Sequence, residues 1–463
     1  MATAEPIAEA LAGWMRRQRW FVGAGGEPSL RIVASVPLPP AGDAEAADVD
    51  VAIHFIADET ESPAVLYQVP VTGRRVKPEA LDHGLIGTVT DDQGHRVHLF
   101  DGPEDPAFAH RLLHLIVRGE GVSGDRAQVR GVAVAPWPFE NLTSEVLRGE
   151  QSNTSIVYTP GGGGRGLPAI CKLFRMVHHG DNPDVVLQSA LFEAGSHSVP
   201  TILGSVAGQW PDPSRPGGRA HGHLAFAQQF LEGAGDAWRL ALDAVNDSSD
   251  FSVSARQMGV ATADIHETLG RVLPTSAATP ADIADVIRSW RARFDAAVRE
   301  VPELETFRGP IEHLYEKARV LPWPSLQRIH GDLHLGQILA LADGTWVIID
   351  FEGEPMRALA ERSLPDVPLR DIAGMLRSFD YAAASGPGHT EHADWARSCR
   401  MAFLDGYAWR SGWDIDDDRL LLDAFEVDKA LYEVVYEARN RPDWLAIPVS
   451  ALRRLAAGVD DAH

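Results

Sequence analysis

Apolar residues are spaced differently in the two halves of the chain. Ile7 and Leu11 recur at helical spacing, so an amphipathic helix is predicted over residues 5–20. Short runs of β-branched and aromatic residues follow, separated by loops rich in Pro, Gly and Asp. These runs predict four strands, at residues 31–36, 51–56, 64–69 and 95–100. The first part of the chain is therefore predicted to be an antiparallel sheet with a helix against it, forming a separate module.

A second strand-rich part begins near residue 106. Residues 106–118 carry apolar side chains at helical spacing and predict a helix, and strands resume at Val129. Two apolar runs, residues 155–159 and 168–174, flank four consecutive glycines and predict a hairpin. Beyond residue 229 the pattern becomes helical, with helices predicted at residues 254–272, 281–298, 311–319 and 369–379. The chain is thus predicted to belong to the α+β class.

Length and charge restrict the possible functions. A chain of 463 residues is long enough for two or three domains. Its formal net charge of −23 disfavours partners such as nucleic acid and anionic membranes. The two cysteines, Cys171 and Cys399, are too few for a disulfide framework and suit a reducing compartment. No signal peptide or membrane-spanning run is evident, so a cytoplasmic location is expected.

The strongest chemical signal is a short segment with the residue types of phosphoryl transfer. Gly331 permits a sharp turn that presents the Asp332 carboxylate, which we predict to orient a substrate hydroxyl. A predicted hairpin then returns Asp350 beside Gln337, and both side chains offer the oxygen atoms that Mg²⁺ prefers. Taken alone, the His330-Gly331-Asp332 triplet would fit a solvated turn equally well, but the hairpin behind it favours catalysis.

Lys172 lies in an apolar strand, where an ammonium group needs an anionic partner. We predict that it contacts the α- and β-phosphates of ATP, although a lysine that protects an edge strand is the alternative. The following helix begins near Pro183 and carries a single glutamate, Glu193, near its C-terminal end. A Lys172–Glu193 pair is therefore the predicted ion pair.

Two further segments are candidates for nucleotide contacts. The small polar residues upstream of the hairpin could offer hydroxyl, amide and backbone N–H groups to phosphates: Ser152, Asn153, Thr154 and Ser155. An ordinary polar turn explains them equally well. The apolar strand that ends at Gln229, Phe230 and Leu231 leads into a Gly-rich turn, as a hinge that meets the adenine edge would. A strand that simply ends in a loop is the alternative.

A late helix combines tyrosines with carboxylates and is predicted to bind a sugar. Aromatic faces and charged hydrogen-bond partners suit sugar hydroxyls, whereas a solvated charged helix is the alternative. The predicted contacts are Tyr432, Glu433, Tyr436, Glu437, Arg439 and Trp444, with His330, Asp332 and Glu352 from the catalytic segment.

With these motifs in view, the chain resembles bacterial maltokinases of the actinobacterial type. These belong to the group similar to aminoglycoside phosphotransferases and protein kinases. The resemblance rests on Gln18-Arg19-Trp20-Phe21, on the triplet ending at Asp332, and on two maltokinase-like segments at residues 350–355 and 432–442. Gln337 stands where the wider group usually has an asparagine, and this substitution is itself maltokinase-like.

The resemblance implies a bilobal protein-kinase-like fold. Its expected parts are an N-terminal cap subdomain at residues 1–105, an intermediate subdomain completing the N-lobe at residues 106–228, and a helical C-lobe at residues 229–463. It also implies Mg²⁺-dependent transfer from ATP to the anomeric hydroxyl of maltose, giving maltose 1-phosphate for glycogen-like α-glucan synthesis. Trehalose synthase is the implied partner.

Two alternatives remain beside this interpretation. A kinase of glucosamine, another amino sugar or an aminoglycoside would keep the same chemistry with another acceptor. A non-catalytic nucleotide-binding partner in a glucan-forming assembly is more remote, because such a protein is expected to lack Asp332 or Asp350, and both are present.

Overall fold

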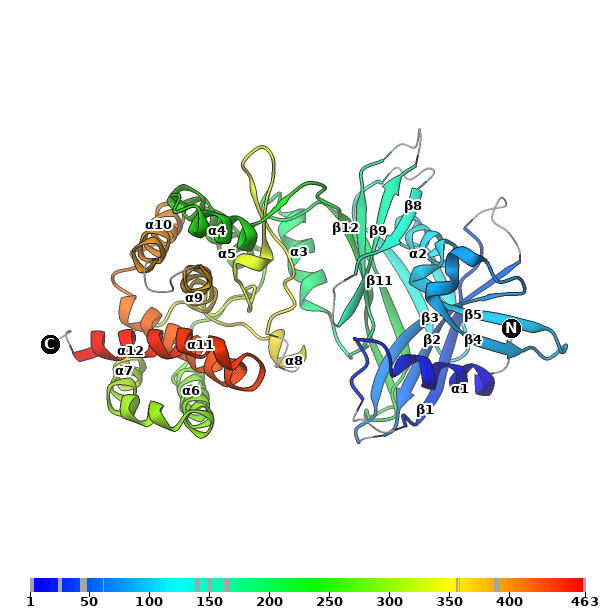
Figure 1. The fold of residues 1–463 in the computed structure, drawn as a ribbon, viewed down its shortest axis with the longest axis horizontal. Helices are drawn as coiled ribbons and strands as arrows, with labels where there is room; N and C mark the ends of the chain where they lie inside the picture. The colour runs from blue at the N-terminus through cyan, green and yellow to red at the C-terminus, as the bar shows by residue number, and fades with distance from the viewer. Residues whose placement is uncertain are drawn as a thin grey trace. The chain divides into compact units, whose positions relative to one another are not determined.

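The computed structural model describes residues 4–23, 27–41, 48–60, 62–137, 142–148, 152–161, 166–354, 357, 359–386 and 392–460. The chain divides into two compact units. Unit 1 comprises residues 1–189 and 200–232, and unit 2 comprises residues 190–199 and 233–463. Unit 1 is rich in strands and unit 2 is mainly helical (Figure 1).

The N-terminal part of unit 1 is a five-stranded sheet in the order β1-β2-β3-β5-β4, whose recorded pairings are antiparallel. Its strands are β1 (Leu30–Pro37), β2 (Val49–Asp58), β3 (Val65–Arg74), β4 (Leu85–Thr90) and β5 (Arg96–Asp101). Helix α1 (Ala4–Met15) packs its apolar side against this sheet through Ile7, Leu11 and Trp14. The four predicted strands are confirmed, but the predicted helix ends at Met15 rather than residue 20. Strand β4, in which Ile86 and Val89 are buried, is not among the strands that the sequence predicts.

The second part of unit 1 is a seven-stranded sheet in the order β6-β7-β11-β12-β10-β9-β8. Its strands are β6 (Gly121–Ser123), β7 (Gln128–Ala133), β8 (Leu142–Val146), β9 (Asn153–Pro160), β10 (Ala169–Phe174), β11 (Ile202–Pro211) and β12 (Arg219–Gln229). The predicted hairpin is confirmed as the antiparallel pair β9–β10, although part of its connecting loop lies outside the described residues. Helix α2 (Pro106–Arg118) lies against this sheet, and its predicted bounds are confirmed (Figure 1).

One hydrophobic core joins the two sheets of unit 1. Phe55 of β2 stacks on Trp210 of β11, with ring centroids 5.4 Å apart, and Leu112 of α2 belongs to the same core. Helix α2 starts where the first sheet ends, because the Asp105 side chain accepts a hydrogen bond from the N–H of Ala107 at 3.0 Å. Unit 1 thus contains all of the predicted cap subdomain and most of the predicted intermediate subdomain, but residues 190–199 of the latter belong to unit 2.

Helix α3 (Pro183–Glu193) begins in unit 1 and ends in unit 2. The remaining helices belong to unit 2: α4 (Ala237–Asn246), α5 (Ser252–Val272), α6 (Pro280–Glu300), α7 (Arg308–Val320), α8 (Leu359–Arg362), α9 (Leu369–Ser385), α10 (Ala393–Ser411), α11 (Arg419–Asn440) and α12 (Ala446–Asp460). Helix α9 is buried along most of its length, because its residues face α10, α11 and α4. The predicted change from strands to helices is confirmed.

A small sheet in unit 2 carries the central segment of the predicted site. It consists of β13 (Gly235–Asp236), β14 (Ile338–Ala340) and β15 (Trp346–Ile348), and β14 pairs with β15 as the predicted hairpin. In the part of the chain that the structure describes, no helix combines the length and apolar character needed to cross a bilayer.

Candidate active site

Gly331 shapes the loop that carries Asp332. Its φ of +86° lies in the left-handed region, and a Cβ atom at this position would lie 3.3 Å from the Cα of Gly353. Any other residue at this position would have a strained backbone conformation, and its Cβ atom would be crowded by Gly353. The glycine of the predicted triplet is therefore required by the turn itself.

Asp371, in the first turn of α9, holds this loop in place. Its carboxylate accepts hydrogen bonds from the N–H groups of His330 and Gly331, both at 2.8 Å, and faces His266 Nε2 at 3.0 Å. The other ring nitrogen of His266 lies 3.0 Å from the Tyr407 hydroxyl. Burial opposes ionisation of Asp371, but these hydrogen bonds and the nearby histidines prevail and lower its pKa. Asp371 thus holds the loop that presents Asp332.

The His330 side chain also helps to hold the loop that carries Asp332. Its ring is buried, and Nε2 lies 2.9 Å from the carbonyl oxygen of Ile349. Nδ1 accepts a hydrogen bond from the N–H of Asp332 at 3.3 Å. Both ring nitrogens therefore have partners within the segment, and the predicted sugar contact of His330 remains a prediction.

The hairpin brings Gln337 and Asp350 together, as the sequence predicts. Gln337 Nε2 donates to Asp350 Oδ2 at 3.1 Å, and the N–H of Ile349 donates to the Gln337 carbonyl at 3.0 Å. Asp350 has a φ of 67°, a conformation that non-glycine residues rarely adopt and that occurs often at functional sites.

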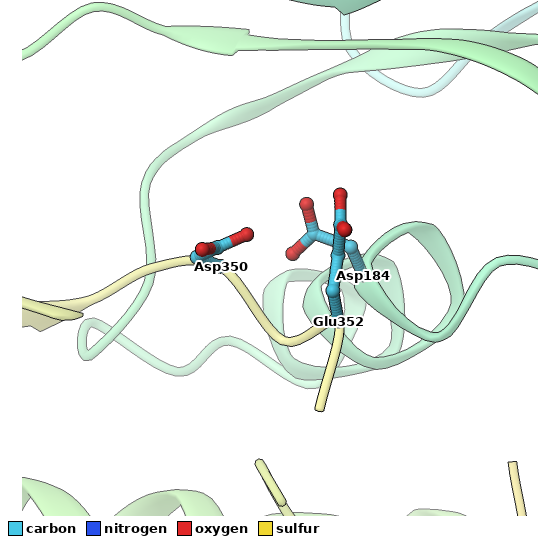
Figure 2. Close-up of side chains that lie close together, drawn as sticks. All are labelled: Asp184, Asp350 and Glu352. Carbon is cyan, nitrogen blue, oxygen red and sulfur yellow. The ribbon is translucent and has the colours of Figure 1, made fainter. Parts of the chain in front are cut away.

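Glu352 lies with Asp350 on the loop after β15. Their carboxylate groups each offer an oxygen within 4.8 Å of the other. Figure 2 shows the side chains of Asp350 and Glu352 on this loop. The sequence predicts a sugar contact for Glu352, but its position beside Asp350 suits a metal ligand as well. The set of one amide and two carboxylate side chains has the hard oxygen donors that Mg²⁺ prefers.

Lys429, which lies close to Asp332, is absent from the predicted site. Lys429 of α11 donates to Asp332 Oδ1 at 3.0 Å and to Glu354 Oε1 at 3.2 Å. Tyr432, a predicted sugar contact, stands one helical turn further along, with its ring centroid 5.0 Å from Lys429 Nζ. The helical spacing of Lys429 and Tyr432 was the available signal, but the contact with Asp332 depends on packing.

Arg362 is a second cation of this site that the sequence did not reveal. Its side chain packs on Gly353, and Nε donates to the Arg357 carbonyl at 2.8 Å. Burial lowers the pKa of Arg362, whereas the charges of Glu352, Asp332 and Asp350 act in the opposite direction. Arg362 thus contributes positive charge near three carboxylates.

The other predicted sugar contacts of α11 lie in an ion-pair network with neighbouring helices. Glu433 accepts from Arg377 Nε and Nη2 at 2.9 and 2.8 Å, and Glu437 accepts from the Tyr381 hydroxyl at 3.1 Å. Arg439 pairs with Glu300 on another face.

The predicted aromatic contacts lie further along the chain. Trp444 stacks on Tyr381 with centroids 6.1 Å apart, and Tyr436 is exposed. Tyr436 lies near the C-terminal end of α11, and Trp444 follows that helix. Their role in sugar binding stays a prediction.

In unit 1, Lys172 forms an ion pair with Asp184. Lys172 Nζ lies 3.1 Å from Asp184 Oδ2, and Gln188 Nε2 donates to the other carboxylate oxygen at 2.6 Å. The predicted partner, Glu193, is the last residue of the same helix. The predicted carboxylate was that of a glutamate, whereas Asp184 in the first turn of the helix supplies it.

The polar segment before β10 is largely engaged by the protein. Ser155 lies opposite Lys172 in the strand register and is buried. The Thr154 hydroxyl accepts a hydrogen bond from Arg175 Nε at 2.8 Å. Ser152 is exposed, and Asn153 begins β9. A phosphate contact of any of these four residues stays a prediction.

The predicted hinge segment follows β12. The N–H of Gln229 donates to the Thr201 carbonyl at 2.8 Å, and the N–H of Phe230 donates to the Pro168 carbonyl at 2.9 Å. Both of these N–H groups thus already donate hydrogen bonds within unit 1. An adenine contact through Leu231 remains a prediction.

Comparisons with known proteins support a kinase-like chain. Residues 14–105 match the family described as the maltokinase N-terminal cap domain. A glucosamine kinase from Streptacidiphilus jiangxiensis is 30% identical over 296 residues, which cover 57% of this chain and 66%, just under two thirds, of that protein. A glucosamine kinase from Mycolicibacterium smegmatis is 27% identical over 408 residues, covering 83% of this chain and 96% of that protein.

A solved structure is similar over almost the whole chain. It is a glucosamine kinase in complex with glucosamine, ADP and inorganic phosphate, with a TM-score of 0.67 and 22% identity, covering 98% of this chain and 99% of that one. This likeness confirms the predicted fold class, with an N-terminal cap, a mixed α/β N-lobe and a mainly helical C-lobe. The cap carries the predicted maltokinase likeness, while the relatives that match more of the chain are named glucosamine kinases.

Proposed function

We propose that the protein is an ATP-dependent sugar kinase and that its acceptor is an amino sugar, with glucosamine as the first candidate. The observation that carries the kinase assignment is the Asp332 loop followed by the Gln337–Asp350 hairpin in one compact unit. Two relatives and a structure of similar fold are named glucosamine kinases, and these names support the choice of acceptor.

Each residue of the site has a definite task under this proposal. Asp332 orients the acceptor hydroxyl for in-line attack on the γ-phosphoryl group and accepts its proton. Lys172 compensates charge on the ATP phosphates. Gln337, Asp350 and Glu352 would hold Mg²⁺, which supplies charge compensation to the phosphates when bound. Asp371 keeps the Asp332 loop in its active geometry.

The proposal is tested by measuring sugar-dependent ADP formation with Mg-ATP. Glucosamine, glucose, maltose and an aminoglycoside are the acceptors to compare, with product analysis by mass spectrometry. We expect glucosamine to have the highest kcat/KM. A chain that binds ATP but phosphorylates none of these compounds would instead support a non-catalytic role.

Substitution of Asp332 tests the chemistry itself. Asp332→Asn is expected to lower kcat by about 10²-fold or more, while the affinity for ATP changes little, because the amide cannot accept the proton. Asp343→Asn is the matched control, since Asp343 is exposed on the turn between β14 and β15. Turnover near the wild-type level in Asp332→Asn would contradict the proposed role.

Maltose is the second candidate acceptor, because the match of residues 14–105 is to a maltokinase cap domain. Transfer to its anomeric hydroxyl would give maltose 1-phosphate. Loss of the reducing end in the product would identify this reaction, and a higher kcat/KM for maltose than for glucosamine would favour it over the first candidate.

A further inference from the structure

Lys429 follows Asp332 by 97 residues in the sequence. Its ammonium lies between the proposed catalytic carboxylate and a second carboxylate, that of Glu354. Its Nζ atom lies 3.0 Å from Asp332 Oδ1 and 3.2 Å from Glu354 Oε1. The Lys429 side chain is 17% exposed, so the ammonium is accessible but largely enclosed. Its position is fixed by α11 and by these two carboxylates.

Glu354 is a second, buried anchor for this ammonium. Its side chain is 3% exposed, and its other carboxylate oxygen lies 3.6 Å from Arg357 Nε. Lys429 therefore keeps one ionic partner even when an acceptor hydroxyl takes its place at Asp332.

An ammonium group has three N–H donors. Two of them face Asp332 and Glu354, and within the described part of the chain no third acceptor contacts Lys429. The Tyr432 ring, with its centroid 5.0 Å from Nζ, covers another side of the group. One donor thus remains for a molecule that enters the site beside Asp332.

Resting on the proposed kinase function, we propose that Lys429 is an acceptor-binding residue that selects the charge of the group next to the transferred hydroxyl. Its ammonium donates to an oxygen of the acceptor beside Asp332 and repels a cationic group from the same position. An amino sugar therefore binds with its ammonium turned away from Asp332 and a neutral hydroxyl face toward Lys429.

The test compares two acceptors that differ in one charged group, glucose and glucosamine. In Lys429→Met, the carboxylates of Asp332 and Glu354 lose the ammonium that lies between them, which an acceptor ammonium can replace but a neutral sugar cannot. We expect the ratio of kcat/KM for glucosamine to that for glucose to rise by about tenfold or more, while KM for ATP stays close to the wild-type value. Lys429→Arg keeps the charge and is expected to keep the ratio.

Chemical rescue provides a second readout. Ethylammonium added to Lys429→Ala should restore part of the glucose phosphorylation, because it returns a cation to the same two carboxylates. Arg419→Met is the matched control, since it removes an exposed cation from the start of the same helix. This control should change neither the ratio nor the response to ethylammonium.

The outcomes separate the two proposals. If the wild-type protein phosphorylates no sugar, the proposed function fails. If it does, but Lys429→Met leaves the ratio and the acceptor KM unchanged, the assignment of Lys429 fails alone. Should Lys429→Met not fold, as judged by circular dichroism, Lys429→Gln replaces it and the same ratio decides, because glutamine keeps a donor without the charge.

Discussion

The position of Asp332 depends on neighbouring residues that need not contact a substrate themselves. Asp371 accepts two N–H groups of the loop, and His266 connects it to Tyr407. A carboxylate can accept all of these bonds, whereas an amide must turn a donor toward one of them. The reactivity of Asp332 is thus expected to depend on the buried charge of Asp371.

Asp371→Asn is predicted to lower kcat by about 10²-fold through misplacement of the loop, with a smaller effect on KM for ATP. Steady-state kinetics with thermal unfolding as a parallel measurement would test this. Tyr407→Phe, at the outer end of the same chain of hydrogen bonds, should have a weaker effect in the same direction. Wild-type kcat in Asp371→Asn would show that the loop holds its shape without this carboxylate.

His54 illustrates how a buried residue makes stability depend on pH. It lies in β2 with a relative exposure of 4%, and burial lowers its pKa from 6.5 to about 4. The unfolded chain binds a proton below pH 6.5, whereas the folded chain does so only near pH 4. The stability contributed by neutral His54 is therefore complete above pH 6.5 and is lost as the pH falls toward 4.

Comparison with His54→Gln, which does not titrate, would reveal this loss. When the pH falls from 7.5 to 5, the free energy of unfolding of the wild type should decrease by about 2 kcal/mol more than that of the variant. Urea unfolding at the two pH values provides the measurement. A difference that stays constant would mean that His54 titrates normally in the folded protein.

At the scale of elements, a buried ion pair connects the end of the first sheet to the strand that carries Lys172. Arg175, just after β10, donates to Asp101 at 3.0 and 2.6 Å and lies 4.8 Å from the centroid of the Trp20 ring. Gln68 of β3 donates to the Phe174 carbonyl at 2.7 Å. The first sheet is thus fastened directly to β10.

Arg175→Met should destabilise unit 1 by about 3–5 kcal/mol, because it leaves the Asp101 carboxylate without its cation. Arg31→Met is the matched control, since the pair of Arg31 with Glu59 is exposed and should cost less than about 1 kcal/mol. Denaturant unfolding followed by circular dichroism would compare the two. Equal effects would indicate that the buried pair is no more important than a surface one.

At the scale of the whole molecule, the N-terminal cap is part of a larger folding unit. Phe55 and Trp210 lie in one core, although one belongs to the cap and the other to the second sheet. Unit 1 also includes residues 200–232, which follow a segment of unit 2, so the chain passes between the units more than once. Neither unit corresponds to one continuous piece of sequence.

Deletion of residues 1–105 is therefore predicted to prevent unit 1 from folding cooperatively, since it exposes the apolar face that packs against Phe55. The truncated chain should bind a hydrophobic dye and lack a sharp thermal transition, unlike the full chain. A truncated chain with a cooperative transition and intact ATP binding would show that the cap is an independent module.

The sequence predicted the parts of the site whose geometry is local. Gly331, Asp332, Gln337 and Asp350 lie within one turn and one short hairpin, so their spacing alone brings the groups together. Periodicity predicted α2 and the late helices for the same reason, because the side chains that face the core recur at fixed intervals along each element.

Only the tertiary structure decided which charges meet. Lys172 pairs with Asp184 in the first turn of α3, whereas the sequence predicted Glu193 at the end of that helix. Lys429 reaches Asp332 from 97 residues away, and Glu433 is held by Arg377 of another helix. Buried charges pair according to how helices and strands pack, and spacing along the chain does not determine that packing. The proposed catalytic carboxylate could thus be found in the sequence, but the lysine that faces it could not.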